Sequence, residues 1–145
     1  MIETAHAIAQ IRAFNRFYTD LIGLLDKHLL NSDYSLAEAR ILYEIQAGQP
    51  ISASQVMATM HIDKSYLSRV LKKLENDKLI HKQSSARDAR TTLLSLTLAG
   101  QAVFTTLNQA SDEQISALLR TLPPAQHQEL VRHMQAITTI LRPTP

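Results

Sequence analysis

The chain has 145 residues, of which 45% are hydrophobic, and a formal net charge of +2, a size and composition typical of a single folded domain. It contains no cysteine and only three scattered glycines. Disulfides, thiolate metal sites and glycine-rich phosphate loops are therefore excluded. No segment reads as a membrane span, and the N-terminus lacks the features of a secretory signal. We therefore expect a cytoplasmic protein.

The first predicted element is a helix from about Thr4 to Leu30. Its apolar residues recur every three or four positions and form one stripe: Ile8, Ile11, Phe14, Tyr18, Leu21, Leu25 and Leu29. This spacing is typical of an amphipathic helix. A helix this long needs an equally long surface to pack against, often a partner chain. The turn-forming run Asn31-Ser32-Asp33 ends it.

Three shorter helices are predicted next. Ser35, with Glu38 three residues later, forms a capping box for a helix that stops at Gly48. Ser52 or Ser54 opens a short helix ending near Met60. After a turn at His61-Ile62, Asp63 caps a helix over 64–76. This order is that of a helix-turn-helix.

The pattern then changes to short strands. Residues 79–83 and 91–97 favour two strands, joined by a polar turn over 84–90. A long helix follows from Thr97 or Leu98 to about Leu119, and a last helix runs from Pro124 to about Leu141. The predicted fold class is therefore mainly α with a small β-hairpin wing: a winged helix-turn-helix with long N- and C-terminal helices.

Charge is concentrated in the middle of the chain. Residues 61–90 carry eight basic and four acidic side chains, a net +4, so the remaining 115 residues sum to −2. A basic segment in a nearly neutral chain is the electrostatic footprint of a nucleic-acid binder. A solvated lysine-rich helix face is the alternative interpretation.

The helix over 64–76 has the two faces that a recognition helix needs. Leu67, Val70, Leu71 and Leu74 form an apolar face for the core. The opposite face carries the candidate DNA-binding residues Ser65, Tyr66, Ser68, Arg69, Lys72 and Lys73. The first four, near the N-terminal end, are expected to reach base edges in the major groove. The two lysines are better suited to phosphates.

The hairpin turn supplies a second candidate DNA contact through Arg87, Asp88 and Arg90. An arginine at a wing tip is attracted by the negative potential of the minor groove. We expect Asp88 to hold the Arg90 guanidinium in a bidentate pair. Simple solvation is the alternative for any one of these residues, but the ordered set favours double-stranded DNA as the partner.

These residues resemble the MarR family of bacterial regulators. The likeness is strongest in the run from Leu67 to Ile80, in Asp88-Ala89-Arg90 and in Leu96-Thr97-Leu98-Ala99-Gly100. It implies a homodimeric transcriptional regulator with an N-terminal dimerisation helix (1–34), a DNA-binding domain (35–100) and C-terminal dimerisation helices (101–145). The sequence has Ala89 where the family often has arginine. Lys78 stands where the family usually has glycine, which predicts a strained turn.

A second resemblance leaves an alternative open. The segments Arg12–Thr19 and Tyr34–Glu44 look like the regulator half of proteins that fuse a MarR-like domain to a GNAT-type acetyltransferase. The alternative function is therefore a regulatory or protein-interaction module of a fused acetyltransferase.

Other candidate sites carry less chemistry. Tyr18, Arg40 and Tyr43 are candidates to bind a small-molecule effector. Ordinary packing and surface pairing are the alternative interpretation. His127 and His133 are six residues apart, which places them on different helix faces, and His28 suits a helix C-terminus better than a metal. We expect no metal, no cofactor and no enzymatic activity, since no nucleophile elbow is present.

Overall fold

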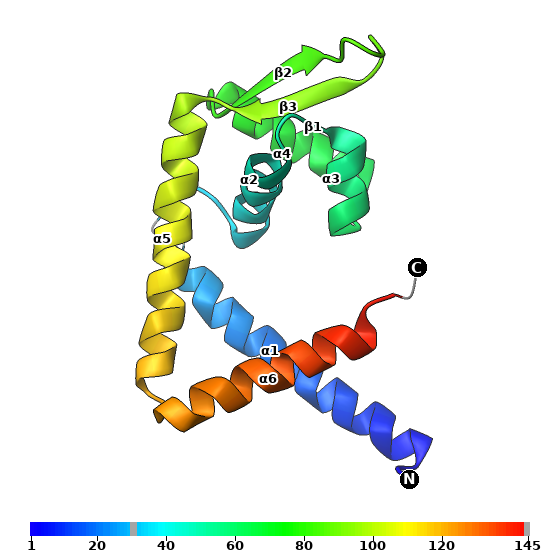
Figure 1. Ribbon diagram of the computed structural model, residues 1–145, viewed down its shortest axis with the longest axis vertical. Coiled ribbons are helices and arrows are strands. Elements are labelled where there is room, and N and C mark those ends of the chain that lie inside the picture. The colour runs from blue at the N-terminus through cyan, green and yellow to red at the C-terminus, as the bar shows by residue number, and fades with distance from the viewer. Residues whose placement is uncertain (30–31, 144–145) are drawn as a thin grey trace. The chain divides into compact units, whose positions relative to one another are not determined.

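The computed structural model describes residues 1–29 and 32–143, with no side-chain description over 26–29. Its elements are, in chain order, α1 (Thr4–Leu29), α2 (Leu36–Gly48), β1 (Ile51–Ser52), α3 (Ala53–Met60), α4 (Lys64–Asn76), β2 (Ile80–Ser84), β3 (Thr92–Leu96), α5 (Leu98–Arg120) and α6 (Pro124–Leu141) (Figure 1). The predicted class, mainly α with a small β-hairpin wing, is confirmed. Predictions that concern Leu30, Asn31, the last two residues and the side chains of His28 and Leu29 lie outside the described part.

The chain forms two compact units, residues 1–110 and 111–145. α5 contributes to both. The three-part division predicted from the sequence stays a prediction. In the described residues, no helix combines the length and apolarity needed to cross a membrane.

The hydrophobic core lies in the first unit and draws on α2, α3, α4, the sheet and α5. Its buried residues are Ile41, Leu42, Ile45, Val56, Leu67, Val70, Leu71, Leu74, Leu79, Ile80, Leu94 and Leu107. The four apolar positions predicted for α4 are all among them. α4 is therefore fixed along one face, which leaves the opposite face free.

Side-chain caps start three of the helices. Ser35 accepts from the Glu38 N–H and the Glu38 carboxylate accepts from the Ser35 N–H, which is the predicted capping box of α2. Ser52, rather than Ser54, caps α3 in the same way with Gln55. Asp63 caps α4 by accepting from the Tyr66 N–H at 2.7 Å. Each cap satisfies backbone donors that would otherwise lack partners.

The sheet has three antiparallel strands in the order β1-β3-β2. β2 and β3 are the predicted hairpin, shifted by a residue at their ends, with Lys82 opposite Leu94. β1 is not predicted by the sequence analysis; it pairs Ile51 with Leu94. Figure 1 shows the hairpin extending away from the helices of the first unit.

A tight junction joins α4, the hairpin and α5. Lys78 has a positive φ of 62°, so the expected unusual turn at this non-glycine position is present. The Thr97 hydroxyl donates to the Lys78 carbonyl at 2.7 Å and accepts from the Gly100 N–H at 2.9 Å. A Cβ at Gly100 would overlap the carbonyl oxygen of Leu79. This close approach explains why the Leu-Thr-x-x-Gly run requires glycine at its last position.

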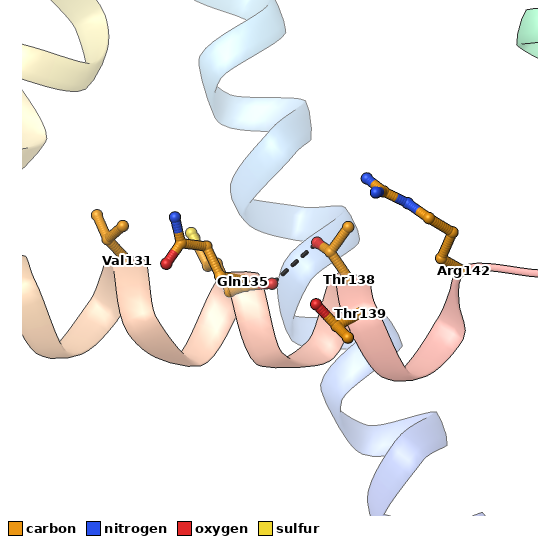
Figure 2. Close-up of a pocket in the computed structure, with 6 residues that line it drawn as sticks. Val131, Gln135, Thr138, Thr139 and Arg142 are labelled. Atoms are coloured by element: carbon orange, nitrogen blue, oxygen red, sulfur yellow. Dashed lines mark hydrogen bonds between the residues drawn. The ribbon is translucent and has the colours of Figure 1, made fainter.

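The second unit is a helical corner. His127 Nε2 lies 2.6 Å from the Leu119 carbonyl and 3.1 Å from the Leu122 carbonyl, so this nitrogen carries a proton and donates to both. One face of α6 lines an open hollow of about 550 Å³, formed by Val131, Met134, Gln135, Thr138, Thr139 and Arg142. Figure 2 shows Val131, Gln135 and Thr138 pointing to one side of α6, with the Thr138 hydroxyl donating to the Met134 carbonyl.

Candidate nucleic-acid interface

α4 presents a polar face beside the part of it that is buried. Leu67 and Leu74 are 1% and 0% exposed. Ser65, Ser68, Arg69 and Lys72 are exposed, and Tyr66 is half-buried. The helix therefore has the two faces predicted for it, with four of the six candidate residues accessible to a partner.

Tyr66 connects the two faces. Its ring packs against the hydrophobic core, and the Arg69 guanidinium lies 5.9 Å from the ring centroid, within range of a cation–π contact. The two residues, with Glu38, Val70 and Lys73, also line an open hollow of about 270 Å³. The Tyr66 ring can therefore orient the guanidinium of Arg69, which is a candidate for contact with DNA bases.

The sequence predicts Lys73 on the outer, DNA-facing side of α4. In the structure its ammonium is instead bound to other parts of the chain. Its ammonium donates to the Asp33 carbonyl at 3.0 Å and lies 2.9 Å from Glu38 Oε2. It also sits 5.0 Å from the centroid of the Tyr34 ring. The prediction treated Lys73 and Lys72 alike because they are neighbours, but consecutive helix positions point in directions 100° apart. Lys73 therefore faces α2.

A second contact lies beside Lys73. The Tyr34 hydroxyl donates to Asp77 Oδ2 at 2.9 Å. Burial, together with this hydrogen bond and the negative charge of Asp77, raises the pKa of Tyr34 to about 12. Burial alone would raise the pKa of Glu38, but hydrogen bonds from Ser35 and Lys73 outweigh it and lower that pKa below its usual value. Sequence reasoning missed Tyr34, Glu38 and Asp77 as partners because no local pattern marks them.

The wing carries its three candidate residues on the turn between β2 and β3. Arg87, Asp88 and Arg90 are all exposed. Asp88 accepts from the backbone N–H of Arg90 at 3.0 Å, and its carbonyl accepts from the Thr91 N–H. In the described residues Asp88 has no ion pair with the Arg90 guanidinium, so the expected bidentate pair is not the geometry found. An Asx-type contact shapes the turn instead and leaves both guanidinium groups at the surface.

The three candidate effector ligands have separate local neighbours. Tyr18 stacks on Phe14 with ring centroids 5.6 Å apart. Arg40 pairs with Glu44 at 2.8 Å, one turn along α2. Tyr43 lies beside Phe104 at 6.4 Å. None of these contacts joins two of the three residues, and an effector site built from them stays a prediction.

Known proteins resemble this chain in sequence or in fold. A sequence profile of the MarR family matches residues 32–91. The HTH-type transcriptional regulator PetP of Rhodobacter capsulatus is 28% identical over 116 residues, which cover 80% of this chain and 68% of PetP.

Two solved structures illustrate the likeness of fold. A mutant of MarR from E. coli, complexed with operator DNA, has a TM-score of 0.75 at 19% identity, covering 94% of this chain and 99% of that one. MepR of S. aureus, in a complex with DNA, has a TM-score of 0.74 at 17% identity, covering 97% of this chain and 100% of that one.

α2, α3 and α4 followed by the β2–β3 hairpin define a winged helix-turn-helix protein. The profile match from α2 to the hairpin turn and the likeness to PetP make this part of the chain similar to the winged domain of the MarR family.

Proposed function

We propose that this protein binds double-stranded DNA sequence-specifically as a homodimeric, MarR-type transcriptional regulator in the bacterial cytoplasm. The observation that carries the proposal is that α4 exposes Ser65, Ser68 and Arg69 while its apolar face is buried. A helix anchored in this way can enter the major groove without unfolding. The structural neighbours complexed with DNA, MarR of E. coli and MepR of S. aureus, support the same use of the fold.

Each exposed side chain takes a role from its chemistry. Arg69 is the candidate for a bidentate contact with guanine. Ser65 and Ser68 can hydrogen-bond to donors or acceptors on the base edges. Lys72 supplies a point charge for a phosphate. Arg87 and Arg90 on the wing suit the minor groove or its flanking phosphates.

The homodimer follows from exposed apolar side chains outside the winged domain. α1 exposes Ile8, Ile11, Phe14 and Phe17, and α6 exposes Val131, Met134, Ile137 and Ile140. Single exposed apolar residues are common, but rows of them along a helix mark an interaction surface. A second copy of the chain is the partner that we propose for these helices.

Regulation by a small molecule is part of the proposal, with Tyr18, Arg40 and Tyr43 as the residues to test first. Arg40 and Tyr43 lie on α2, the helix whose N-terminus contacts Lys73 of α4. A ligand that moves α2 would therefore also shift the position of α4. The likeness to the regulator half of an acetyltransferase fusion stays a hypothesis from sequence alone.

The test begins with selection of bound sequences from random duplexes, followed by fluorescence anisotropy on the selected site. Arg69→Ala and Arg90→Ala should each weaken binding by roughly ten- to a hundred-fold, as expected for about 1–3 kcal/mol per contact. Arg120→Ala, an exposed arginine on α5, is the matched control and should bind like wild type. Wild-type affinity for both test variants at moderate salt would refute the assignment.

A further inference from the structure

We propose that Lys73 is a positioning residue rather than a DNA contact. With Tyr34, Glu38 and Asp77 it forms a latch that fixes the recognition helix α4 to the first turn of α2 and to the chain segment before it. This inference rests on the proposed function, since it concerns how α4 is presented to DNA. It assigns different roles to two adjacent lysines that the sequence does not distinguish.

The contacts of Lys73 are the first evidence. Its ammonium has three donors. The Asp33 carbonyl accepts at 3.0 Å, and the two Glu38 carboxylate oxygens lie at 3.1 and 2.9 Å. To reach a phosphate, Lys73 would have to give up these partners and leave the Glu38 carboxylate close to the approaching anion. Repulsion between that carboxylate and the phosphate opposes such a movement.

Tyr34 is the second evidence, because it touches the latch at both ends. Its ring lies beneath the Lys73 ammonium at 5.0 Å. Its hydroxyl donates to Asp77 at 2.9 Å, and Asp77 is the C-cap of α4. Positions 73 and 77 are one turn apart on the same side of a helix. One side chain therefore fastens the last turn of α4 at two points.

Lys72 provides the contrast. It is exposed, and its side chain makes no hydrogen bond or ion pair within the described part of the chain. Lys72 can therefore neutralise a phosphate, whereas the Lys73 ammonium is already bound to Asp33 and Glu38. The pair thus offers a matched comparison, in which the same residue type and the same charge are removed one position apart.

We expect the latch to affect sequence-specific DNA binding more than non-specific binding. The segment with Asp33 and Tyr34 follows α1 in the chain, and α1 is part of the dimer interface that we propose. Binding at two half-sites requires a fixed placement of both recognition helices. Sequence-independent binding to phosphates requires little such precision. Loosening the latch should therefore reduce specific affinity and leave non-specific affinity nearly unchanged.

The experiment compares Lys72→Gln, Lys73→Gln, Lys73→Arg and Tyr34→Phe with wild type. Fluorescence anisotropy is measured on the selected duplex and on a scrambled duplex over a range of salt concentrations. Lys72→Gln should weaken both and lower the slope of log affinity against log salt by about 0.9 for each phosphate that the lysine neutralises. Lys73→Gln and Tyr34→Phe should keep the slope and lower specific affinity alone, by roughly tenfold. Lys73→Arg, which can still bond to Glu38, should restore it.

Hydrogen exchange tests the latch without DNA. Amides in the last turn of α4 should exchange several-fold faster in Tyr34→Phe and Lys73→Gln than in wild type, while those of Lys72→Gln should not change. Unchanged exchange in both latch variants overturns the proposal. So does a Lys73→Gln slope that falls as far as that of Lys72→Gln. If wild type selects no duplex at all, the proposed function fails, and the exchange result alone decides whether the latch exists.

Discussion

At the scale of single residues, two of the three glycines of the chain differ in whether the fold has room for a side chain. Gly100 lies at the start of α5, where a Cβ would overlap the Leu79 carbonyl oxygen. Gly23 lies in α1, and a Cβ added there would meet no atom within 4 Å. The backbone of Leu79 cannot withdraw, because its N–H and carbonyl are both bonded, to Leu74 and Thr97.

Gly100→Ala should therefore lower the free energy of unfolding by at least about 2 kcal/mol, as expected for overpacking against backbone. Gly23→Ala should raise it by up to about 1 kcal/mol, since alanine is the better helix former. Urea unfolding followed by circular dichroism measures both. A Gly100→Ala protein as stable as wild type would mean that the junction of α4, β2 and α5 is looser than the structure indicates.

Lys78 shows how far reasoning at single residues reaches. Its positive φ of 62° lies in the left-handed region that glycine adopts most readily. An L-residue in this region costs roughly 1–2 kcal/mol. The neighbouring Thr97 contact to the Lys78 carbonyl helps to hold it there. A family pattern was enough to predict this turn, because the constraint is local to one backbone position.

At the scale of elements, the helix boundaries were predictable where the signals lie within four residues of each other. Ser35 with Glu38, and Asp63 before Lys64, place the starts of α2 and α4 as the structure has them. β1 was not predictable in the same way. It has two residues, and it exists because Ile51 pairs with Leu94, 43 positions further along the chain.

The same limit explains the site. The exposure of Ser65, Ser68 and Arg69 follows from helical periodicity. The partners of Lys73 do not, since Asp33 and Glu38 are 40 and 35 residues away. Periodicity assigns a residue to a face, but contacts between elements determine whether its charge is already neutralised.

Glu38 links two elements through charge, and this predicts an acid-dependent stability. Because its pKa is lowered in the folded state by hydrogen bonds that outweigh burial, the stabilisation is present above its ordinary value of 4.5. It is lost as the pH falls through the lower folded-state pKa. Wild type should exceed Glu38→Gln in free energy of unfolding by on the order of 0.5 kcal/mol near neutral pH, since Lys73 is partly in solvent. The difference should shrink below about pH 4.5.

Urea unfolding at a series of pH values measures this difference. Lys73→Gln provides the control, because Glu38 then lacks its cationic partner. In that background Glu38→Gln should show a weaker dependence on pH. Equal pH dependence in both backgrounds would show that the ion pair between α2 and α4 contributes nothing.

At the scale of the whole molecule, the apolar stripe of α1 is one feature that a single chain leaves unexplained. Ile8, Ile11 and Phe14 are 54%, 61% and 46% exposed. A monomer gains nothing by placing such a row in water, whereas the homodimer that we propose would bury it. Two DNA-binding domains held at a fixed spacing can engage successive major grooves, about one helical turn apart. Under the proposed function, the stripe therefore bears on DNA recognition as well as on assembly.

Phe14→Glu tests this role, since burying an unpaired carboxylate is costly. We expect its dimer dissociation constant, from sedimentation velocity, to rise at least a hundred-fold, and its specific DNA affinity to fall with it. Ala9→Glu adds the same charge at an exposed position on the other side of α1 and should remain dimeric. Circular dichroism should show both variants folded, because Phe14 lies outside the core. A dimeric Phe14→Glu protein with wild-type affinity would exclude α1 from the interface, and the spacing of the two recognition helices would then have to be set by the second unit alone.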